Sequence, residues 1–170
     1  MVEIITEFPQ FFTASNFKKQ HLLKPDKYKD IVAESLRFLV EDRRIHLFAF
    51  AIMVNHIHLI WQMRAGRKKS DVQRDFMKYT AQRIKADLEI NHPLVLDYFK
   101  VEAADRNFQF WRRNPLYIEM INENMMKQKI DYVHLNPVRA GLCILPEEYK
   151  YSSAAFYQSG FDNWGFLTHC

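Results

Sequence analysis

Stretches of hydrophobic and polar positions divide the chain into eight expected elements. Runs rich in apolar, β-branched and aromatic residues predict strands, and apolar positions spaced three or four apart among charged residues predict helices. The expected order is strand, helix, strand, strand, helix, strand, strand, helix, at residues 3–13, 25–42, 45–53, 57–62, 70–89, 96–102, 108–120 and 122–136. This order predicts an α+β fold in which the helices pack on one face of a largely antiparallel sheet, leaving the other face for a site.

Local signals set the expected ends of the helices. Pro25 suits a first helical turn, residues 70–73 (Ser-Asp-Val-Gln) have the form of a capping box, and residues 91–93 (Asn-His-Pro) should stop the second helix. Asn122 is the expected cap of the third helix. That helix should end before Pro137, because a proline pushes the residue ahead of it out of the helical region.

Composition is that of one globular domain spanning residues 1–170. Hydrophobic residues make up 48% of the chain and charged residues 26%, a balance that argues against disorder. The net charge of +4 suits an anionic partner. Cys143 and Cys170 form neither a metal-ligand pair nor a disulfide framework, so a reducing cytoplasm is the expected location. We expect no signal peptide and no membrane span, because no long apolar run is present.

His56 and His58 form the first candidate site. Alternate side chains of a strand share a face, so the two imidazoles project together while Ile57, Leu59 and Trp61 point the other way. Their backbone positions are about 6.6 Å apart, and both rings can reach one metal ion at about 2.0–2.1 Å. The pattern predicts a metal-binding pair. The alternative is a packed or solvated pair that binds no ion.

The last expected helix carries the second candidate site. Ile130 and Val133 lie on its core stripe. Tyr132 points away from that stripe and shares a face with Asn136, one turn later, and with Lys129, one turn earlier. His134, in contrast, lies about 160° around the helix from Tyr132, which excludes it as a ligand of the same site.

Two interpretations of this face stay open on the residues alone. In one, Tyr132 is a packing residue and Asn136 helps the turn into Pro137. In the other, Tyr132 is a nucleophile and Asn136 supplies a third metal ligand through its side-chain oxygen. A phenol is mostly protonated at neutral pH, so the second interpretation requires a nearby cation or base.

Taken together, the two segments resemble a known family. Residues 53–59 (Met-Val-Asn-His-Ile-His-Leu) and 132–142 (Tyr-Val-His-Leu-Asn-Pro-Val-Arg-Ala-Gly-Leu) resemble the HUH single-tyrosine transposases, most closely their REP-associated branch. Residues 149–153 look like the Tyr-x-x-Ser-Ser tail of that family. Val54 departs from the family pattern, which often has proline there, and this should alter the turn while leaving every proposed ligand in place.

The resemblance implies a fold and a reaction. The fold would be a ferredoxin-like or RRM-like antiparallel sheet with His56 and His58 on a central strand. These histidines and Asn136 would bind Mg²⁺ or Mn²⁺, and Tyr132 would be the catalytic nucleophile. The enzyme would cleave single-stranded or hairpin DNA through a 5′-phosphotyrosine and rejoin it without ATP, as a homodimer.

Basic residues supply candidate DNA contacts. Arg64, Arg67, Lys68 and Lys69 follow the histidine strand and could track phosphates together with Lys129. The alternative for the run at 64–69 is an ordinary solvated loop. Two alternative functions also stay open: a nucleic-acid-binding protein that has lost cleavage, and a metal-dependent hydrolase that uses water as its nucleophile.

Overall fold

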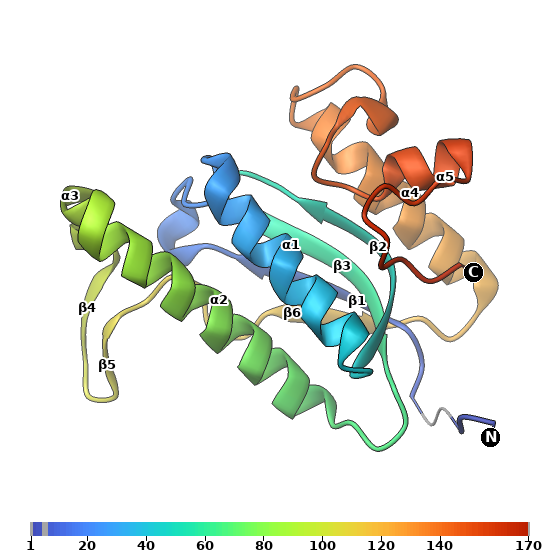
Figure 1. Cartoon of the computed structure of the whole chain (residues 1–170), viewed down its shortest axis with the longest axis horizontal. Coiled ribbons are helices and arrows are strands. Elements are labelled where there is room, and N and C mark those ends of the chain that lie inside the picture. Colours follow the sequence, from blue (N-terminus) through green and yellow to red (C-terminus); the bar gives the residue numbers. More distant parts are fainter. Residues whose placement is uncertain (1, 5–6, 170) are drawn as a thin grey trace.

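The computed structural model describes residues 2–4 and 7–169. Its main sheet contains β1 (Gln10–Ser15), β2 (Ile45–Ile52), β3 (His56–Met63) and β6 (Leu116–Glu119), in the order β2-β3-β1-β6. Each neighbouring pair is antiparallel, which confirms the predicted α+β class. β1 and β3 are the central strands, so the histidine strand has a neighbour on both sides (Figure 1).

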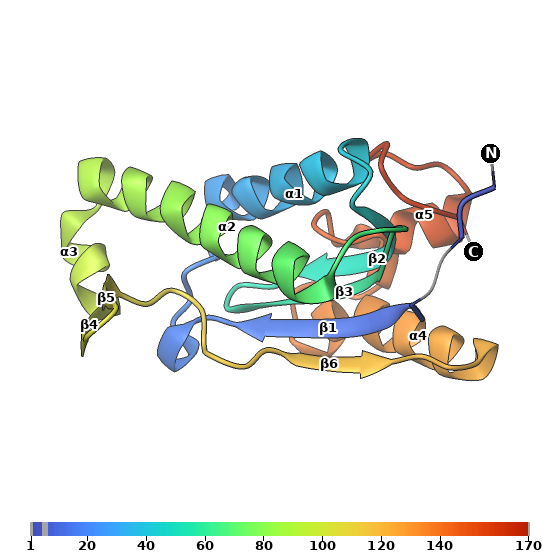
Figure 2. The same cartoon turned by 90° about the horizontal axis from the view of Figure 1, so that it is seen from below.

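Helices cover both faces of this sheet. α1 (Asp26–Glu41) and α2 (Lys69–Asn91) lie on one face, and α4 (Glu123–Arg139) lies on the other (Figure 2). The expectation that all helices share one face is therefore wrong for α4. Its physical reason is a second apolar cluster, in which Ile130 and Val133 of α4 pack with Phe11 and Ile60 of the central strands.

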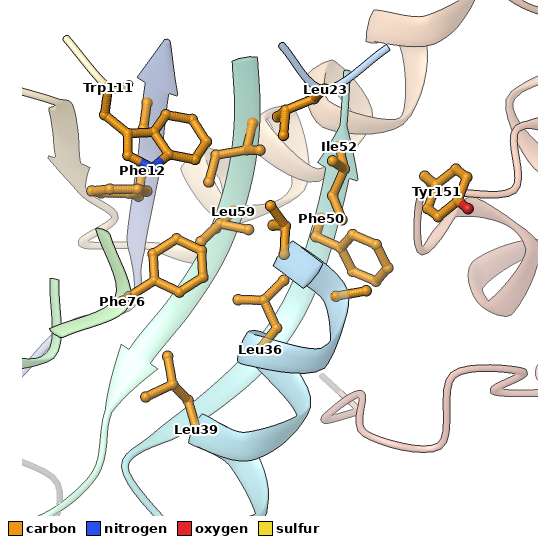
Figure 3. Packing of buried hydrophobic residues seen from close by; sticks show 14 of the residues in the cluster. Phe12, Leu23, Leu36, Leu39, Phe50, Ile52, Leu59, Phe76, Trp111 and Tyr151 are labelled. Atoms are coloured by element: carbon orange, nitrogen blue, oxygen red, sulfur yellow. The ribbon is translucent and has the colours of Figure 1, made fainter. Parts of the chain in front are cut away.

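The larger core lies between the sheet and the first two helices. The fully buried side chains of Phe12 and Leu59 point from the central strands toward Leu36 of α1 and Phe76 of α2 (Figure 3). Trp61 of β3 belongs to the same cluster, with its ring centroid 5.8 Å from that of Phe76. Phe12 and Phe11 are adjacent in β1 yet belong to different clusters, because successive strand residues face opposite sides of the sheet.

Shorter elements complete the chain. They are η1 (Phe17–Lys19), α3 (Pro93–Leu96), η2 (Asp97–Phe99), β4 (Lys100–Ala103), β5 (Arg106–Phe108), η3 (Pro146–Glu148) and α5 (Ala154–Ser159). β4 and β5 form a separate two-stranded hairpin, which extends away from α3 (Figure 1). Among the described residues, no helix is both long enough and apolar enough to cross a membrane.

Strand boundaries are the part of the sequence prediction that needs most correction. The first strand was expected at 3–13 and begins at Gln10, with residues 5–6 outside the described residues. The strands expected at 96–102 and 108–120 are replaced by the hairpin of β4 and β5 and by the short β6. Residues 109–115 between them carry Pro115, which cannot donate a ladder hydrogen bond.

Two helix ends also differ from the expectation. α2 begins one residue early, and its N-cap Lys68 makes no side-chain cap hydrogen bond, so the predicted capping box at 70–73 is wrong. Asn122 does cap α4, accepting a hydrogen bond from the Met125 amide at 2.9 Å. α4 nevertheless continues past Pro137 to Arg139. A proline this close to a helix end removes one backbone hydrogen bond and leaves the preceding turns intact.

The C-terminal segment is attached to the edge of the sheet. The Ile52 amide donates to the Tyr151 carbonyl at 2.8 Å, and the Ser153 amide donates to the Phe50 carbonyl at 3.0 Å. The Thr168 amide likewise reaches the Leu47 carbonyl at 2.7 Å. These bonds protect the outer edge of β2, which would otherwise expose unpaired backbone groups.

Candidate functional site

The two histidines lie side by side on the face of β3 that α4 covers. Their ring centroids are 4.8 Å apart. Ile57, Leu59 and Trp61 are fully buried in the larger core on the opposite face. The strand therefore places the imidazoles as the alternation of residues predicts, on a central strand.

α4 brings Tyr132 and Asn136 to the same place. The Tyr132 ring centroid is 5.4 Å from that of His58, and Asn136 Oδ1 is 3.2 Å from His56 Nε2. All four side chains line one open pocket, whose other walls are Ser15, Lys19 and Asn55. Tyr132 is 38% exposed, so a ligand in the pocket can reach it.

Neighbouring side chains fix how the imidazoles face the pocket. Thr13 Oγ1 lies 2.7 Å from His58 Nδ1, across the pairing of β1 with β3. Asn55 Oδ1 lies 2.7 Å from His56 Nδ1. These contacts occupy both Nδ1 atoms, and His56 Nε2 faces Asn136 Oδ1. His58 Nε2 is buried and has no hydrogen-bond partner among the described residues.

Burial keeps both imidazoles neutral. It is the largest cause that lowers the pKa of His58 to about 3, with further lowering by the charges of His56 and Lys129. Burial also lowers the pKa of His56, against a smaller opposing effect of Asn136. A neutral imidazole is the form that binds metal ions.

The donor set fits a divalent cation. As placed, His56 has an oxygen next to each ring nitrogen, and a neutral ring carries one N–H. If Nδ1 carries the proton, the lone pair of His56 Nε2 faces the lone pair of Asn136 Oδ1, and a cation bound by both atoms would satisfy them. The alternative is an Asn136 amide rotated so that its NH₂ group donates to Nε2. Among residues 2–4 and 7–169, no cluster of three His, Cys, Asp or Glu side chains could hold a metal. Beside the two imidazoles, a further donor atom in the pocket is the amide oxygen of Asn136.

Two cations flank the tyrosine. Lys129 Nζ lies 5.5 Å from the Tyr132 ring centroid and 4.8 Å from that of Phe11. The Arg139 guanidinium carbon lies 5.4 Å from the Tyr132 ring centroid. No carboxylate is among the described residues that line the pocket, so its charge is positive.

Several residues of this site escaped the sequence analysis. Arg139 could have been found, because it lies seven positions after Tyr132 and so returns to the same helix face after two turns. Thr13, Asn55 and Lys19 gave no such signal. Their places depend on strand register and on how the loop after β1 folds back.

The basic loop after β3 lies away from this pocket. Arg64 is eight residues beyond His56, about 26 Å along an extended strand. Its guanidinium pairs with Glu3 at 2.6 Å, and Lys69 Nζ lies 3.6 Å from the Tyr117 ring centroid. The structure places Lys129 at the pocket and leaves Arg64, Arg67, Lys68 and Lys69 at the far end of β3.

His134 is turned away from the pocket, as its helical position predicts. Its Nε2 lies 2.7 Å from Ser153 Oγ in the buried contact between α4 and the C-terminal segment. Ser153 Oγ also accepts a hydrogen bond from the Phe50 amide at 2.9 Å. This arrangement connects α4 with the edge strand through one hydroxyl, although no side chain of the connection reaches the pocket.

Comparison with known proteins gives a match in three dimensions. No protein-family model and no curated protein sequence matches the chain. A solved structure of a REP-associated tyrosine transposase bound to a REP hairpin superposes with a TM-score of 0.67 and 16% sequence identity, covering 99% of this chain and 89% of that chain. A second solved structure, a provisionally assigned transposase from Deinococcus radiodurans R1, gives a TM-score of 0.48 and 14% identity over 78% of this chain and 90% of that chain. The chain has the fold of a REP-associated tyrosine transposase.

Proposed function

We propose that this chain, as a single domain, cleaves and rejoins single-stranded DNA through a covalent bond to Tyr132. The observation that carries the proposal is the convergence of Tyr132 and Asn136 from α4 on His56 and His58 from β3. A nucleophile, two neutral imidazoles and an amide oxygen thus share one open, positively charged pocket.

Tyr132 would supply the nucleophile. Its phenolic oxygen attacks the phosphorus of a phosphodiester, and the bond from phosphorus to the 3′ oxygen breaks. The products are a 5′-phosphotyrosyl ester and a free 3′ hydroxyl, with a net transfer of one proton from the phenol to the leaving 3′ oxygen. A 3′ hydroxyl can reverse the step without ATP, because the new ester keeps the phosphodiester bond type.

Lys129 and Arg139 would assist this step electrostatically. Both cations lie within 6 Å of the Tyr132 ring. They stabilise negative charge as it builds on the phenolic oxygen, and they attract the phosphate. The absence of a carboxylate among the described pocket residues suits a polyanionic substrate.

His56, His58 and Asn136 would hold a divalent cation, Mg²⁺ or Mn²⁺. An amide oxygen suits either ion, and the two imidazole ligands favour Mn²⁺ over the harder Mg²⁺. When bound, such an ion polarises a phosphodiester and stabilises charge in the transition state. The chain's own contribution is to present neutral Nε2 atoms, whose rings Thr13 and Asn55 orient.

The substrate and assembly extend the proposal. The solved relative in fold is bound to a REP hairpin, and we propose hairpin-bearing single-stranded DNA as the substrate here. Lys129 would contact its phosphates near the cleavage point. Phosphates farther along the strand would be contacted by the basic loop, Arg64, Arg67, Lys68 and Lys69. We also propose that the chain forms a homodimer, which light scattering can test.

The decisive experiment is covalent capture. The protein is incubated with labelled single-stranded hairpin DNA and Mn²⁺, then run on a denaturing gel. We expect a shifted, protease-sensitive band that is absent for Tyr132→Phe and unchanged for Tyr79→Phe, a tyrosine of α2 outside the pocket. His58→Ala should reduce the band, with His46→Ala as its matched control.

The other outcomes separate the alternatives. DNA binding without an adduct in Mn²⁺ or Mg²⁺ would indicate a non-catalytic binding protein. Cleavage that persists in Tyr132→Phe would indicate water as the nucleophile. Either result would refute the proposed role of Tyr132.

A further inference from the structure

The loop after β1, residues 16–25, lies between the candidate pocket and a second surface groove. Lys19 of η1 lines the pocket beside His56. Immediately afterwards, residues 20–25 form one wall of a separate groove, whose other wall contains Val95 and Tyr98. Figures 1 and 2 both place this loop and α3 at the same end of the molecule. One short loop therefore borders both the pocket and the groove.

This loop is held in a fixed conformation. The Asn16 amide donates to the Asn55 carbonyl at 2.8 Å, and the Leu23 amide donates to the Val54 carbonyl at 2.9 Å. Between them, Lys18 and Lys19 adopt left-handed backbone angles, with φ of 52° and 54°. Residues other than glycine rarely adopt these backbone angles, and strain of this kind persists where the surrounding structure enforces it.

The loop carries cations that no carboxylate neutralises. Lys18, Lys19 and Lys24 are exposed, and none of them forms an ion pair with a described residue. The acidic residues near the groove pair elsewhere: Asp26 with Lys29 at 3.2 Å and Asp97 with Lys100 at 2.9 Å. Lys19 thus lies at the pocket and Lys24 at the groove, and Lys18, next to Lys19 in the chain, has its ammonium 5.2 Å from the Phe17 ring centroid.

The far wall of the groove offers an aromatic surface. Tyr98 is 66% exposed, and the adjacent Phe99 is buried in the core, which anchors the backbone beneath it. Val95 is 41% exposed next to it. Exposed aromatic rings beside lysines are the stacking platforms on which proteins bind the bases of single strands.

We propose that the groove between residues 20–25 and Tyr98 is a binding site for a base of single-stranded DNA, reached along Lys18, Lys19 and Lys24 from the cleavage pocket. The inference rests on the proposed function and adds a second contact region to it. Charge complementarity favours a polyanionic strand over an apolar peptide, because Lys24 lines the groove, Lys19 lines the pocket, and neither pairs with a described carboxylate.

The test compares strands of two lengths by fluorescence anisotropy. The short strand has about four nucleotides, and the long strands carry the same core extended to about twelve nucleotides on the 5′ or the 3′ side. We expect Tyr98→Ala to weaken binding of at least one long strand about fivefold or more, the lower end of a base-stacking contact. Tyr98→Phe should keep the affinity, whereas Tyr98→Leu should lose it.

Lys24→Ala tests whether the strand follows the lysines to the groove. It should weaken binding of the same long strand and reduce the salt dependence of its affinity by about one phosphate contact, a slope change of about 0.7. Tyr79→Ala and Lys78→Ala, exposed residues of α2, are the matched controls and should change neither quantity.

The outcomes distinguish this inference from the proposed function. Equal affinities of wild type, Tyr98→Ala and Lys24→Ala for both long strands would overturn the inference, even if the covalent adduct forms. Full affinity in Tyr98→Leu would also overturn it, because an apolar contact would then suffice. Loss in Tyr98→Ala without any adduct would support the groove and refute cleavage.

Discussion

Thr13 Oγ1 lies 2.7 Å from His58 Nδ1, so a residue of β1 sets the orientation of a ring on β3. The hydroxyl oxygen can accept a hydrogen bond from Nδ1–H, which leaves the lone pair on the buried Nε2, an atom with no hydrogen-bond partner among the described residues. The two central strands thus contribute jointly to one ligand.

Thr13→Val should weaken metal binding. The substitution keeps the side-chain shape and removes the hydroxyl, so the His58 ring loses the contact that fixes its orientation. We expect about tenfold weaker Mn²⁺ binding by calorimetry, the usual effect of losing such an orienting contact. Thr13→Ser retains the hydroxyl and should bind as the wild type does. Equal affinity of Thr13→Val and wild type would contradict the assigned role.

Asn136→Asp should raise the pKa of His56 above its wild-type value. The substitution places a carboxylate about where Asn136 Oδ1 lies, 3.2 Å from His56 Nε2. An opposite charge at this distance favours the protonated imidazole and opposes the effect of burial. NMR titration of the histidine ring protons measures the change. Asn107→Asp, in the distant hairpin, should leave the pKa of His56 unchanged. If Asn136→Asp also left the pKa of His56 unchanged, the contact between the two side chains would be contradicted.

Stability should fall as the pH drops from 6.5 to 4.5. Burial lowers the pKa of His58 to about 3 and that of His134 to about 4, and it also lowers the pKa of His56. Below pH 6.5 the unfolded chain therefore binds protons that the folded chain does not, and the free energy of unfolding decreases. Each histidine contributes at most about 1.4 kcal/mol per pH unit.

Urea denaturation at several pH values measures this slope. Glu3 and Asp87 contribute mainly below this window, because their pKa values are lowered to about 2 from ordinary values of 4.5 and 3.8. A His56→Asn/His58→Asn double variant should show a shallower loss. A free energy of unfolding that stays constant from pH 6.5 to 4.5 would contradict the burial of neutral histidines.

Ser153→Ala should destabilise the fold by about 1–3 kcal/mol. The substitution leaves the buried His134 Nε2 and the Phe50 amide without the shared hydroxyl. Ser159→Ala, on the exposed end of α5, is the matched control and should change stability little. Urea denaturation of both variants measures the free energy of unfolding. If Ser153→Ala were as stable as the wild type, the shared hydroxyl would not be needed, and water would take its place.

Sequence patterns predict the parts of the site that depend on local periodicity. The alternation along β3 puts His56 and His58 on one face, and the helical repeat of α4 aligns Tyr132 with Asn136. Each relation lies within one element, where backbone geometry fixes side-chain direction. In the structure, both pairs line one pocket.

Relations between elements could not be predicted in the same way. The contact of Thr13 with His58 depends on the register of β1 against β3, and the chain around Thr13 carries no signal for it. The place of α4 was also missed, because its core stripe of Ile130 and Val133 does not say which face of the sheet it covers. The sequence predicts a stop at Pro137, whereas α4 continues two residues beyond it to Arg139.

The alternation along β3 also restricts how the gene can change. A one-residue insertion or deletion just before this strand that shifted the whole strand by one position would exchange its two sets of side chains, sending both imidazoles into the larger core and Leu59 and Trp61 toward the pocket. β2 shows where the sheet does accept an irregularity, since its register shifts between Leu47 and Ala49. That strand lies at the edge and has one partner in the sheet. Length variation among relatives should therefore accumulate at β2 and in the loops, while β3 keeps a constant number of residues.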